Sequence, residues 1–363
     1  MRFGNSKITF KNTQSRKNNH FYELFSQKNR IPKYVLGTNI YAESIAKNYD
    51  INGFIDDSRR KKNYLGKAVY KTKDVPNNSL VINAAGGSTI SARSKLLANN
   101  LNNLDYFAFR LLSKHKLEPL IFNKGFKKDL IKNIAEYKKC FCRLSDSLSK
   151  KLFQRLLSFR ANNNISNLNG IKSKSEQYFE KFLKFKSNKV RFFDVGGFRG
   201  ETTLKLLENF SNIESIHIFE PSKKNRQAIN IRTGINNIFL HKCALTNTNG
   251  ETFLTDNQDC SKIQKRGVSI VATRKMDNFI NLSPNFLKID IEGGELLCLK
   301  GAKSIITKFN PAIAIAVYHK PDHIWKIPKL ILSYNSNYSI KLRHYSENIF
   351  ETIMYFIPKN EKN

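Results

Sequence analysis

A glycine-rich turn preceded by an acid is the first group in this 363-residue chain that could do chemistry. It reads Asp-Val-Gly-Gly-Phe-Arg-Gly-Glu-Thr and begins at Asp194, directly after the apolar run 190–193. Glycines let a backbone approach a ligand closely, and the helix expected next offers unpaired N–H groups. The spacing departs from the G-x-G-x-x-G of dinucleotide sites, and the Asp194 carboxylate would repel a pyrophosphate but neutralise an ammonium group. The turn therefore predicts a ligand with a cationic end, and a purely structural turn is the alternative.

Glu220 is a second candidate, because it comes immediately after the apolar run 215–219 and before Pro221 and Ser222. In doubly wound folds an acid at this place hydrogen-bonds the ribose hydroxyls of a nucleotide. A solvated acid at the start of a helix is the alternative. Taken with the glycine turn, Glu220 predicts a nucleoside ligand at the crossover point of a parallel sheet.

A third group is the acidic segment 288–295, Lys-Ile-Asp-Ile-Glu-Gly-Gly-Glu, at the end of another apolar run. Asp290, Glu292 and Glu295 could position an acceptor hydroxyl or take its proton. Their oxygens are also ligands that a divalent metal accepts. Nothing in the spacing requires a metal, so we expect none. No catalytic base is singled out by these residues.

His319, His323 and Trp325 follow the next apolar run, 312–317. A histidine in this position could face the acceptor, and a hydrogen-bonded rim residue is the alternative. Trp325 is the only tryptophan of the chain. Core packing is its default interpretation, with sugar stacking as the other.

Alternating apolar runs and helical stretches must position these residues. The second half of the chain contains strand-like segments at 190–193, 215–219, 237–243, 286–291, 312–317, 339–342 and 352–357. This pattern predicts an α/β fold with a seven-stranded Rossmann-like sheet, in which five parallel strands precede a terminal pair and the last strand is antiparallel.

A smaller Rossmann-like α/β domain is expected from the runs 34–36, 51–57 and 80–87. The predicted organisation is a polar tail at 1–30, this nucleotide- or sugar-binding-type domain at 31–110, a helical connector at 111–185 and the main domain at 186–363. Gly37 is followed by Thr38 and Asn39 with no second glycine nearby, which argues against bound NAD. Sugar-acceptor binding, dimerisation and nucleotide binding remain open for the smaller domain.

Composition indicates a globular, strongly basic protein. Apolar residues make up 40% of the chain, and the formal charge is +33. The excess charge is spread along the chain without a dense basic run, which argues against nucleic acid as a partner. The five cysteines include no Cys-x-x-Cys pair, and the basic N-terminus lacks the apolar segment of a signal peptide. We therefore expect a cytoplasmic protein, and peripheral contact with the inner face of the membrane stays open.

Five ordered motifs in residues 176–358 resemble FkbM-type methyltransferases. They are the glycine turn, F-E-P-S at 219–222, K-I-D-I-E-G-G-E at 288–295, A-V-Y-H-K-P-D-H-I-W-K-I-P at 316–328, and L-R-H-Y-S with E-T-I-M-Y between 342 and 355. The resemblance implies a class I methyltransferase fold, S-adenosylmethionine as methyl donor, and O-methylation, often of sugars in bacterial surface glycans or of natural products.

The resemblance also assigns roles to individual residues. Those implied to bind the cofactor are Asp194, Gly196, Gly197, Gly200, Thr202, Glu220 and Pro221. Those implied to face the acceptor and to act in catalysis are Asp290, Glu292 and His319. Gly197 departs from the family, which usually has alanine or another small residue there.

The function expected from these residues is transfer of a methyl group to a sugar hydroxyl of a bacterial surface glycan precursor, of the capsule or lipopolysaccharide type. The acceptor would be a sugar, a nucleotide-sugar or a lipid-linked glycan. The alternatives are an RNA or natural-product methyltransferase and a non-catalytic binding module that keeps the S-adenosylmethionine fold. The oligomeric state is open, a dimer included.

Overall fold

The computed structural model describes residues 2–3, 6–8, 15–59, 62–185, 189–233, 237–257, 260–264 and 269–359. Contacts divide the chain into two compact units. The N-terminal unit comprises Met1–Lys127, Leu152–Lys172 and Ser346–Phe350. The C-terminal unit comprises Lys128–Lys151, Ser173–Tyr345 and Glu351–Asn363.

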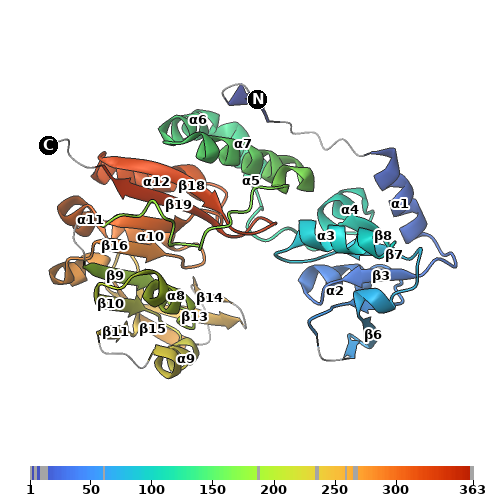
Figure 1. The fold of residues 1–363 in the computed structure, drawn as a ribbon, viewed down its shortest axis with the longest axis horizontal. Coiled ribbons are helices and arrows are strands. Elements are labelled where there is room, and N and C mark those ends of the chain that lie inside the picture. Colours follow the sequence, from blue (N-terminus) through green and yellow to red (C-terminus); the bar gives the residue numbers. More distant parts are fainter. Residues whose placement is uncertain are drawn as a thin grey trace. The chain divides into compact units, whose positions relative to one another are not determined.

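The C-terminal unit is built on the predicted seven-stranded sheet (Figure 1). In spatial order its strands are β11 (Ile238–His241), β10 (Ile213–Phe219), β9 (Val190–Val195), β16 (Phe286–Ile289), β17 (Ala312–Ala316), β19 (Thr352–Pro358) and β18 (Tyr338–His344). The first five are parallel, and β19 is antiparallel to both of its neighbours. The central strands are apolar runs because helices cover both faces of the sheet. The expected fold class is confirmed.

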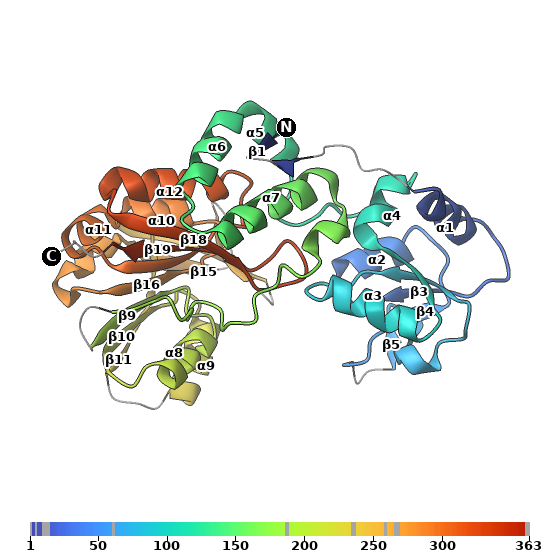
Figure 2. The same ribbon diagram turned by 45° about the horizontal axis from the view of Figure 1, so that its top comes forward.

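Two groups of helices cover this sheet, as Figures 1 and 2 show. On one side lie α8 (Glu201–Asn209) and α9 (Lys223–Thr233). On the other lie α10 (Glu295–Lys300), α11 (Lys303–Phe309) and α12 (His323–Tyr334). The short 3-10 helix η3 (Met276–Leu282) packs on α11.

A second, four-stranded sheet in this unit was not predicted. Its order is β12 (Cys243–Leu245), β15 (Ser269–Arg274), β13 (Gly250–Asn257) and β14 (Cys260–Gln264). Residues 250–274 are too polar to stand out as strands. The expected single strand at 237–243 is in fact two elements, because β11 ends at His241 and β12 begins at Cys243.

The N-terminal unit contains a six-stranded sheet with Rossmann-like order. Its strands are β5 (Asn63–Tyr64), β6 (Lys67–Tyr70), β4 (Gly53–Ile55), β3 (Lys33–Leu36), β7 (Leu80–Asn83) and β8 (Asn102–Asp105). All neighbouring strands except the pair β5–β6 are parallel. Its other elements are β1 (Arg2–Phe3), β2 (Ser6–Lys7), α2 (Ile40–Ala46), η1 (Thr72–Asp74), α3 (Thr89–Ala98), α4 (Tyr106–Leu112) and η2 (Ile165–Leu168).

A helix, α1 (Arg16–Ser26), lies within the segment expected to be a polar tail. The Ser15 side chain caps it by accepting from the Asn18 N–H. Phe21 and Phe25, four residues apart, share one face and are buried. Two aromatic side chains therefore anchor a helix whose remaining residues are largely polar.

The predicted helical connector contains α5 (Phe126–Lys132), α6 (Ile134–Arg143) and α7 (Ser147–Asn162). Its residues are divided between the units, because Lys128–Lys151 belongs to the C-terminal unit and Leu152–Lys172 to the N-terminal unit. Helix α6 packs on α12. None of the described helices has the length and hydrophobicity needed to cross a membrane.

Candidate active site

The glycine turn between β9 and α8 is shaped by contacts that leave no room for side chains. Gly196 has φ +85°, and a Cβ there would lie 2.0 Å from the Asp290 carbonyl oxygen. A Cβ on Gly197 would lie 2.2 Å from Cγ2 of Ile218. The turn thus runs directly against the neighbouring strands β16 and β10, and its backbone is open to a ligand on the remaining side. Gly200, with φ +86°, caps α8.

Asp194 does not reach the ligand side of this turn. Its side chain is fully buried, its Oδ1 lies 2.9 Å from Nζ of Lys288, and its Oδ2 accepts from the Thr203 hydroxyl at 3.0 Å. Lys288 also donates to the Gly196 carbonyl at 2.6 Å. In this arrangement Asp194 holds the turn in place through Lys288, and the cofactor contact that the resemblance implies for Asp194 stays a prediction.

Glu220 lies at the carboxyl end of β10, where its two oxygens accept backbone N–H groups. The donors are Phe198 in the glycine turn, at 2.9 Å, and Ser222, at 2.8 Å. Burial raises the pKa of Glu220, and these two hydrogen bonds oppose the rise. The carboxylate is thereby fixed in orientation with lone pairs left for hydroxyl groups, as ribose binding requires.

A cavity of about 360 Å³ runs along the carboxyl ends of β9, β10, β16 and β17. Of the residues expected to bind cofactor, five line it: Gly196, Gly197, Thr202, Glu220 and Pro221. Asp194 and Gly200 belong to the turn segment but do not line the cavity. A nucleoside fits this cavity on three grounds: the exposed backbone of the turn, the fixed Glu220 carboxylate, and apolar walls from Phe219, Ala244 and Leu245.

The lining of the cavity also contains an acidic group. Asp290, Glu292 and Glu351 line the cavity together with the phenols of Tyr178 and Tyr318. The Tyr178 hydroxyl donates to Oδ2 of Asp290 at 2.5 Å. Burial, and then the charge of Asp290, raise the pKa of both tyrosines well above the ordinary value, so the phenols are neutral donors.

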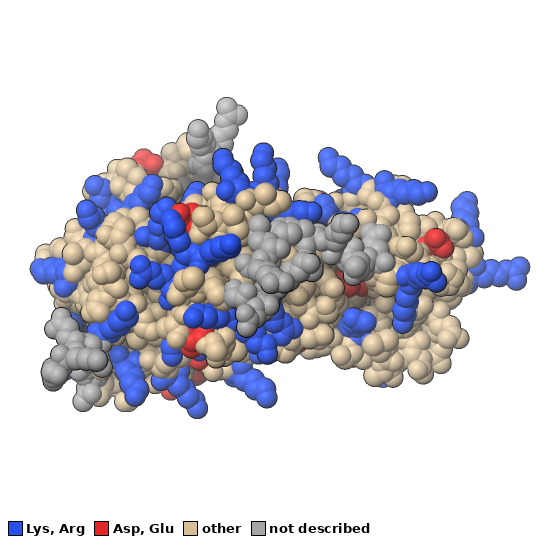
Figure 3. Space-filling view, turned by 90° about the horizontal axis from the view of Figure 1, so that it is seen from above, with Lys and Arg blue, Asp and Glu red and all other residues tan. Residues whose placement is uncertain are grey.

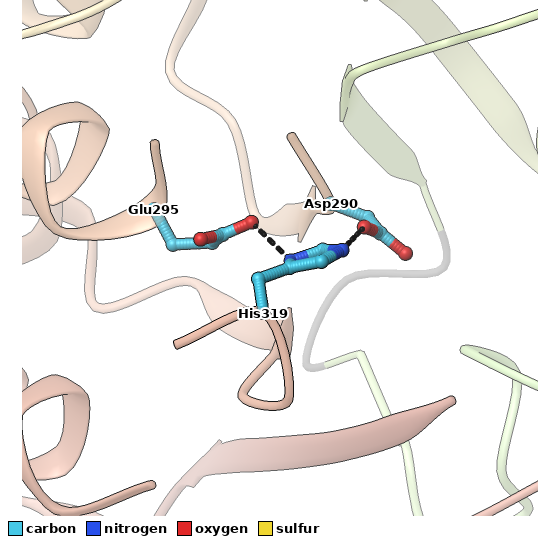
Figure 4. Close-up of side chains that lie close together, drawn as sticks. All are labelled: Asp290, Glu295 and His319. Carbon is cyan, nitrogen blue, oxygen red and sulfur yellow. Dashed lines mark hydrogen bonds and ion pairs between the residues drawn. The ribbon is translucent and has the colours of Figure 1, made fainter. Parts of the chain in front are cut away.

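His319, expected to face the acceptor, is buried beside the cavity and does not line it. Figure 4 shows its ring between two carboxylates: Nδ1 lies 2.8 Å from Oε1 of Glu295, and Nε2 lies 3.4 Å from Oδ1 of Asp290. Burial would lower the pKa of His319, but the charge and hydrogen bond of Glu295, then Asp290 and Glu292, raise it to about 9. An imidazolium with both nitrogens turned to carboxylates is an orienting cation and a poor proton acceptor.

Donor atoms of Asp290, Glu295 and His319 lie close enough together to suit a metal ion. The pKa of His319 is about 9, so a metal would have to displace a proton from the imidazolium at neutral pH. Glu295 is fully buried and accepts the N–H groups of Ile291 and Gly293. In this arrangement the cluster works as an internal salt-bridge network.

The sequence reasoning missed the residues that complete the acidic part of the cavity. Tyr318 and Glu351 were detectable in principle, since one follows β17 and the other precedes β19 at the same edge of the sheet. Tyr178 lies in a segment that is neither helix nor strand, so no periodic pattern in the sequence indicates that it is a site residue. The Gln177 side chain donates to Oε2 of Glu351 and orients it.

The first prediction concerns the turn. Gly196→Ala should destabilise the protein by about 1–3 kcal/mol, because the added methyl group overlaps a backbone carbonyl that cannot move away. It should weaken binding of S-adenosylmethionine, the implied ligand, by about tenfold or more. Calorimetry and thermal unfolding measure both. Gly87→Ala is the control, because nothing lies within 4 Å of its Cβ; equal effects of the two variants would contradict the close approach.

The second prediction concerns His319. Its pKa is higher in the folded protein, about 9, than in an unfolded chain, about 6.5, so the protonated ring stabilises the fold. This contribution is fully present below about pH 6.5 and is lost as the pH rises through 9. Urea unfolding followed by Trp325 fluorescence should show stability falling by about 1–3 kcal/mol across this window. His319→Gln should reduce the dependence of the unfolding free energy on pH, whereas His20→Gln, at an exposed position, should leave this dependence unchanged.

Comparisons with known proteins agree with this geometry. Residues 194–356 match the family model of the methyltransferase FkbM domain. An FkbM methyltransferase from Methylobacillus flagellatus KT has a similar solved structure, with 22% identity, a TM-score of 0.70, and coverage of 94% of this chain and 93% of that one. This likeness shows the fold alone. No curated protein matches the chain.

Two further solved structures have weaker likeness. Aeropyrum pernix fibrillarin, in complex with S-adenosyl-L-methionine, has 14% identity, a TM-score of 0.32, and coverage of 47% of this chain and 68% of that one. An rRNA methylase from Streptococcus thermophilus has 11% identity, a TM-score of 0.33, and coverage of 48% and 89%. At these scores neither bears on what this protein does.

The matched stretch runs from the glycine turn to the last strand of the sheet, and it contains Glu220, Asp290 and Glu351. The fold around it is that of a solved member of the same family. Residues 194–356 therefore form an FkbM-family methyltransferase domain, and the enzyme takes its methyl group from S-adenosylmethionine.

Proposed function

We propose that this enzyme methylates a sugar hydroxyl of a bacterial surface glycan precursor. The observation that carries the proposal is the composition of the cavity beyond the cofactor residues. Three carboxylates and two neutral phenols meet there, the carboxylates being those of Asp290, Glu292 and Glu351. Carboxylates and phenols hydrogen-bond the several hydroxyls of a sugar, and one carboxylate can receive the proton of the reacting hydroxyl.

The same charges disfavour an anionic acceptor. A phosphodiester next to the reacting hydroxyl, as in RNA, would meet Asp290, Glu292 and Glu351 within a partly buried cavity, where like charges repel strongly. Lys288, the basic residue of the lining, is engaged by Asp194. A non-catalytic binding module would have no use for this acidic cluster beside the cofactor residues.

Bound S-adenosylmethionine supplies an activated methyl group on its cationic sulfur. The protein's own part is to orient: the glycine turn and Glu220 would hold the nucleoside, and the acidic residues of the cavity would position the acceptor hydroxyl. In the transfer, a carbon–oxygen bond would form, the carbon–sulfur bond would break, and its electron pair would stay on sulfur. The hydroxyl proton passes to a carboxylate.

Glu351 is the carboxylate best suited to receive this proton. Both oxygens of Asp290 are already engaged, by Tyr178 and His319. Burial, and then the nearby charge of Asp290, raise the pKa of Glu351 to about 6. A carboxylate with this pKa is ionised at neutral pH and more basic than an exposed one, which favours it as general base.

The third prediction tests the glycan acceptor. Deletion of the coding sequence should remove one methyl group from a surface polysaccharide, measured by mass spectrometry of released glycans. Complementation with the wild-type chain should restore the methyl group, whereas complementation with Gly196→Ala should not. An unchanged glycan together with loss of an RNA methyl group would overturn the proposal in favour of the RNA alternative.

The fourth prediction tests the base. The wild-type kcat should rise with pH through about 6 as Glu351 ionises, and Glu351→Gln should lower kcat about a hundredfold and abolish this limb. S-adenosylmethionine affinity should remain, because Glu351→Gln keeps the size of the side chain and leaves Glu220 and the turn unchanged. The exposed Glu208→Gln on α8 is the control. If the kcat of Glu351→Gln still rises with pH near 6, another group is the base.

A further inference from the structure

An apolar groove lies between α6 and α12 of the C-terminal unit, separate from the methyltransferase cavity. Its volume is about 550 Å³, and its floor is formed by Cys140, Trp325, Pro328 and Leu332. Pro328 lacks the N–H group that would continue the hydrogen bonding of α12, and it is buried among the residues that line the groove. The groove is thus an apolar feature that the methyl-transfer chemistry does not use.

Basic side chains form the rim of this groove. Lys138, Lys139, Arg143 and Lys329 line it, opposed by the single carboxylate of Glu136. Glu136 pairs with Lys139 and Lys329, both at 3.0 Å, and among the described residues neither Lys138 nor Arg143 forms an ion pair. The rim therefore carries net positive charge around an apolar floor.

The surrounding surface has the same sign. Residues 128–151 contain seven Lys or Arg and three Asp or Glu, and α12 adds Lys326 and Lys329 without an acid. Figure 3 looks down on the helices at the top of Figure 1, and its left half shows Lys and Arg side chains gathered there with few acids between them. Ile131 and Leu148, on α5 and α7, are more than half exposed.

From this combination we propose that the groove and its basic rim bind the surface of an anionic membrane. Acyl chains would contact the apolar floor while Lys138 and Arg143 reach the lipid phosphates. Lysine and arginine suit this arrangement because their aliphatic stems lie along apolar surface and their charged ends extend to the headgroups. The proposal does not depend on the identity of the methyl acceptor.

Other occupants fit less well. A second copy of the chain would bring another surface of the same positive sign, in a protein of net charge +33. Single-stranded RNA would need an open aromatic face for base stacking. Trp325 does not offer one, because it is 8% exposed, its indole N–H donates to Asp129, and Lys326 and Lys329 lie over its ring at 5.4 and 5.9 Å.

The fifth prediction is binding of the full chain to vesicles that contain phosphatidylglycerol, measured by co-sedimentation. Binding should be lost with vesicles of phosphatidylcholine alone and weakened by high salt. The double variant Lys138→Gln with Arg143→Gln should bind about thirtyfold more weakly, at about 1 kcal/mol for each charge. The control, Lys300→Gln with Lys303→Gln, removes the same charge from exposed positions of α10 and α11 and should bind like the wild type.

A spectroscopic measurement locates the contact. The single tryptophan lines the groove, so vesicles with brominated acyl chains should quench Trp325 fluorescence, and Leu332→Asp should abolish the quenching. S-adenosylmethionine affinity, measured in parallel, reports whether Leu332→Asp is folded. The proposal is overturned if vesicles bind without quenching, if both double variants weaken binding equally, or if the groove variants affect RNA binding and leave vesicle binding unchanged.

Discussion

The buried ion pair between Asp194 and Lys288 is the interaction on which the active site depends. It joins β9 to β16, and the same two side chains also hold α8, through Thr203, and the carbonyl of Gly196. Removing one partner of such a pair leaves an uncompensated buried charge, at a cost of about 3–5 kcal/mol. The turn must sit against two neighbouring strands without side chains of its own, and the pair supplies the anchor that the glycines lack.

A second buried network, around Glu295, gives the neighbouring acids different roles. Glu295 accepts two backbone N–H groups and also holds His319 and His323, and His319 in turn reaches Asp290. His319 and Tyr178 thereby fix the Asp290 carboxylate. The pKa of Glu351, in contrast, is raised by burial and by the charge of Asp290. Two carboxylates at the same end of one cavity thus differ in basicity because their surroundings differ.

Charge is distributed in opposite senses inside and outside this protein. The chain as a whole is strongly basic, yet its cavity is lined by Glu220, Asp290, Glu292 and Glu351. Acids in the cavity suit a cationic methyl donor and a neutral acceptor, while the basic groove on α6 and α12 suits an anionic surface. Net charge alone indicated neither feature, since it averages over both.

The sequence by itself determined the sheet, the cofactor turn and the place of Glu220, because these follow from local patterns: apolar runs, glycine spacing and an acid at a strand end. It also indicated Asp290 and Glu292. Tertiary structure alone decided which acids line the cavity and which are buried behind it. Asp194 is buried and forms an ion pair with Lys288, and His319 lies between two carboxylates. Tyr178 and Glu351 interact with Asp290 although both are more than 60 residues away from it in sequence. Burial and charge pairing arise from contacts between distant segments, and no local pattern encodes them.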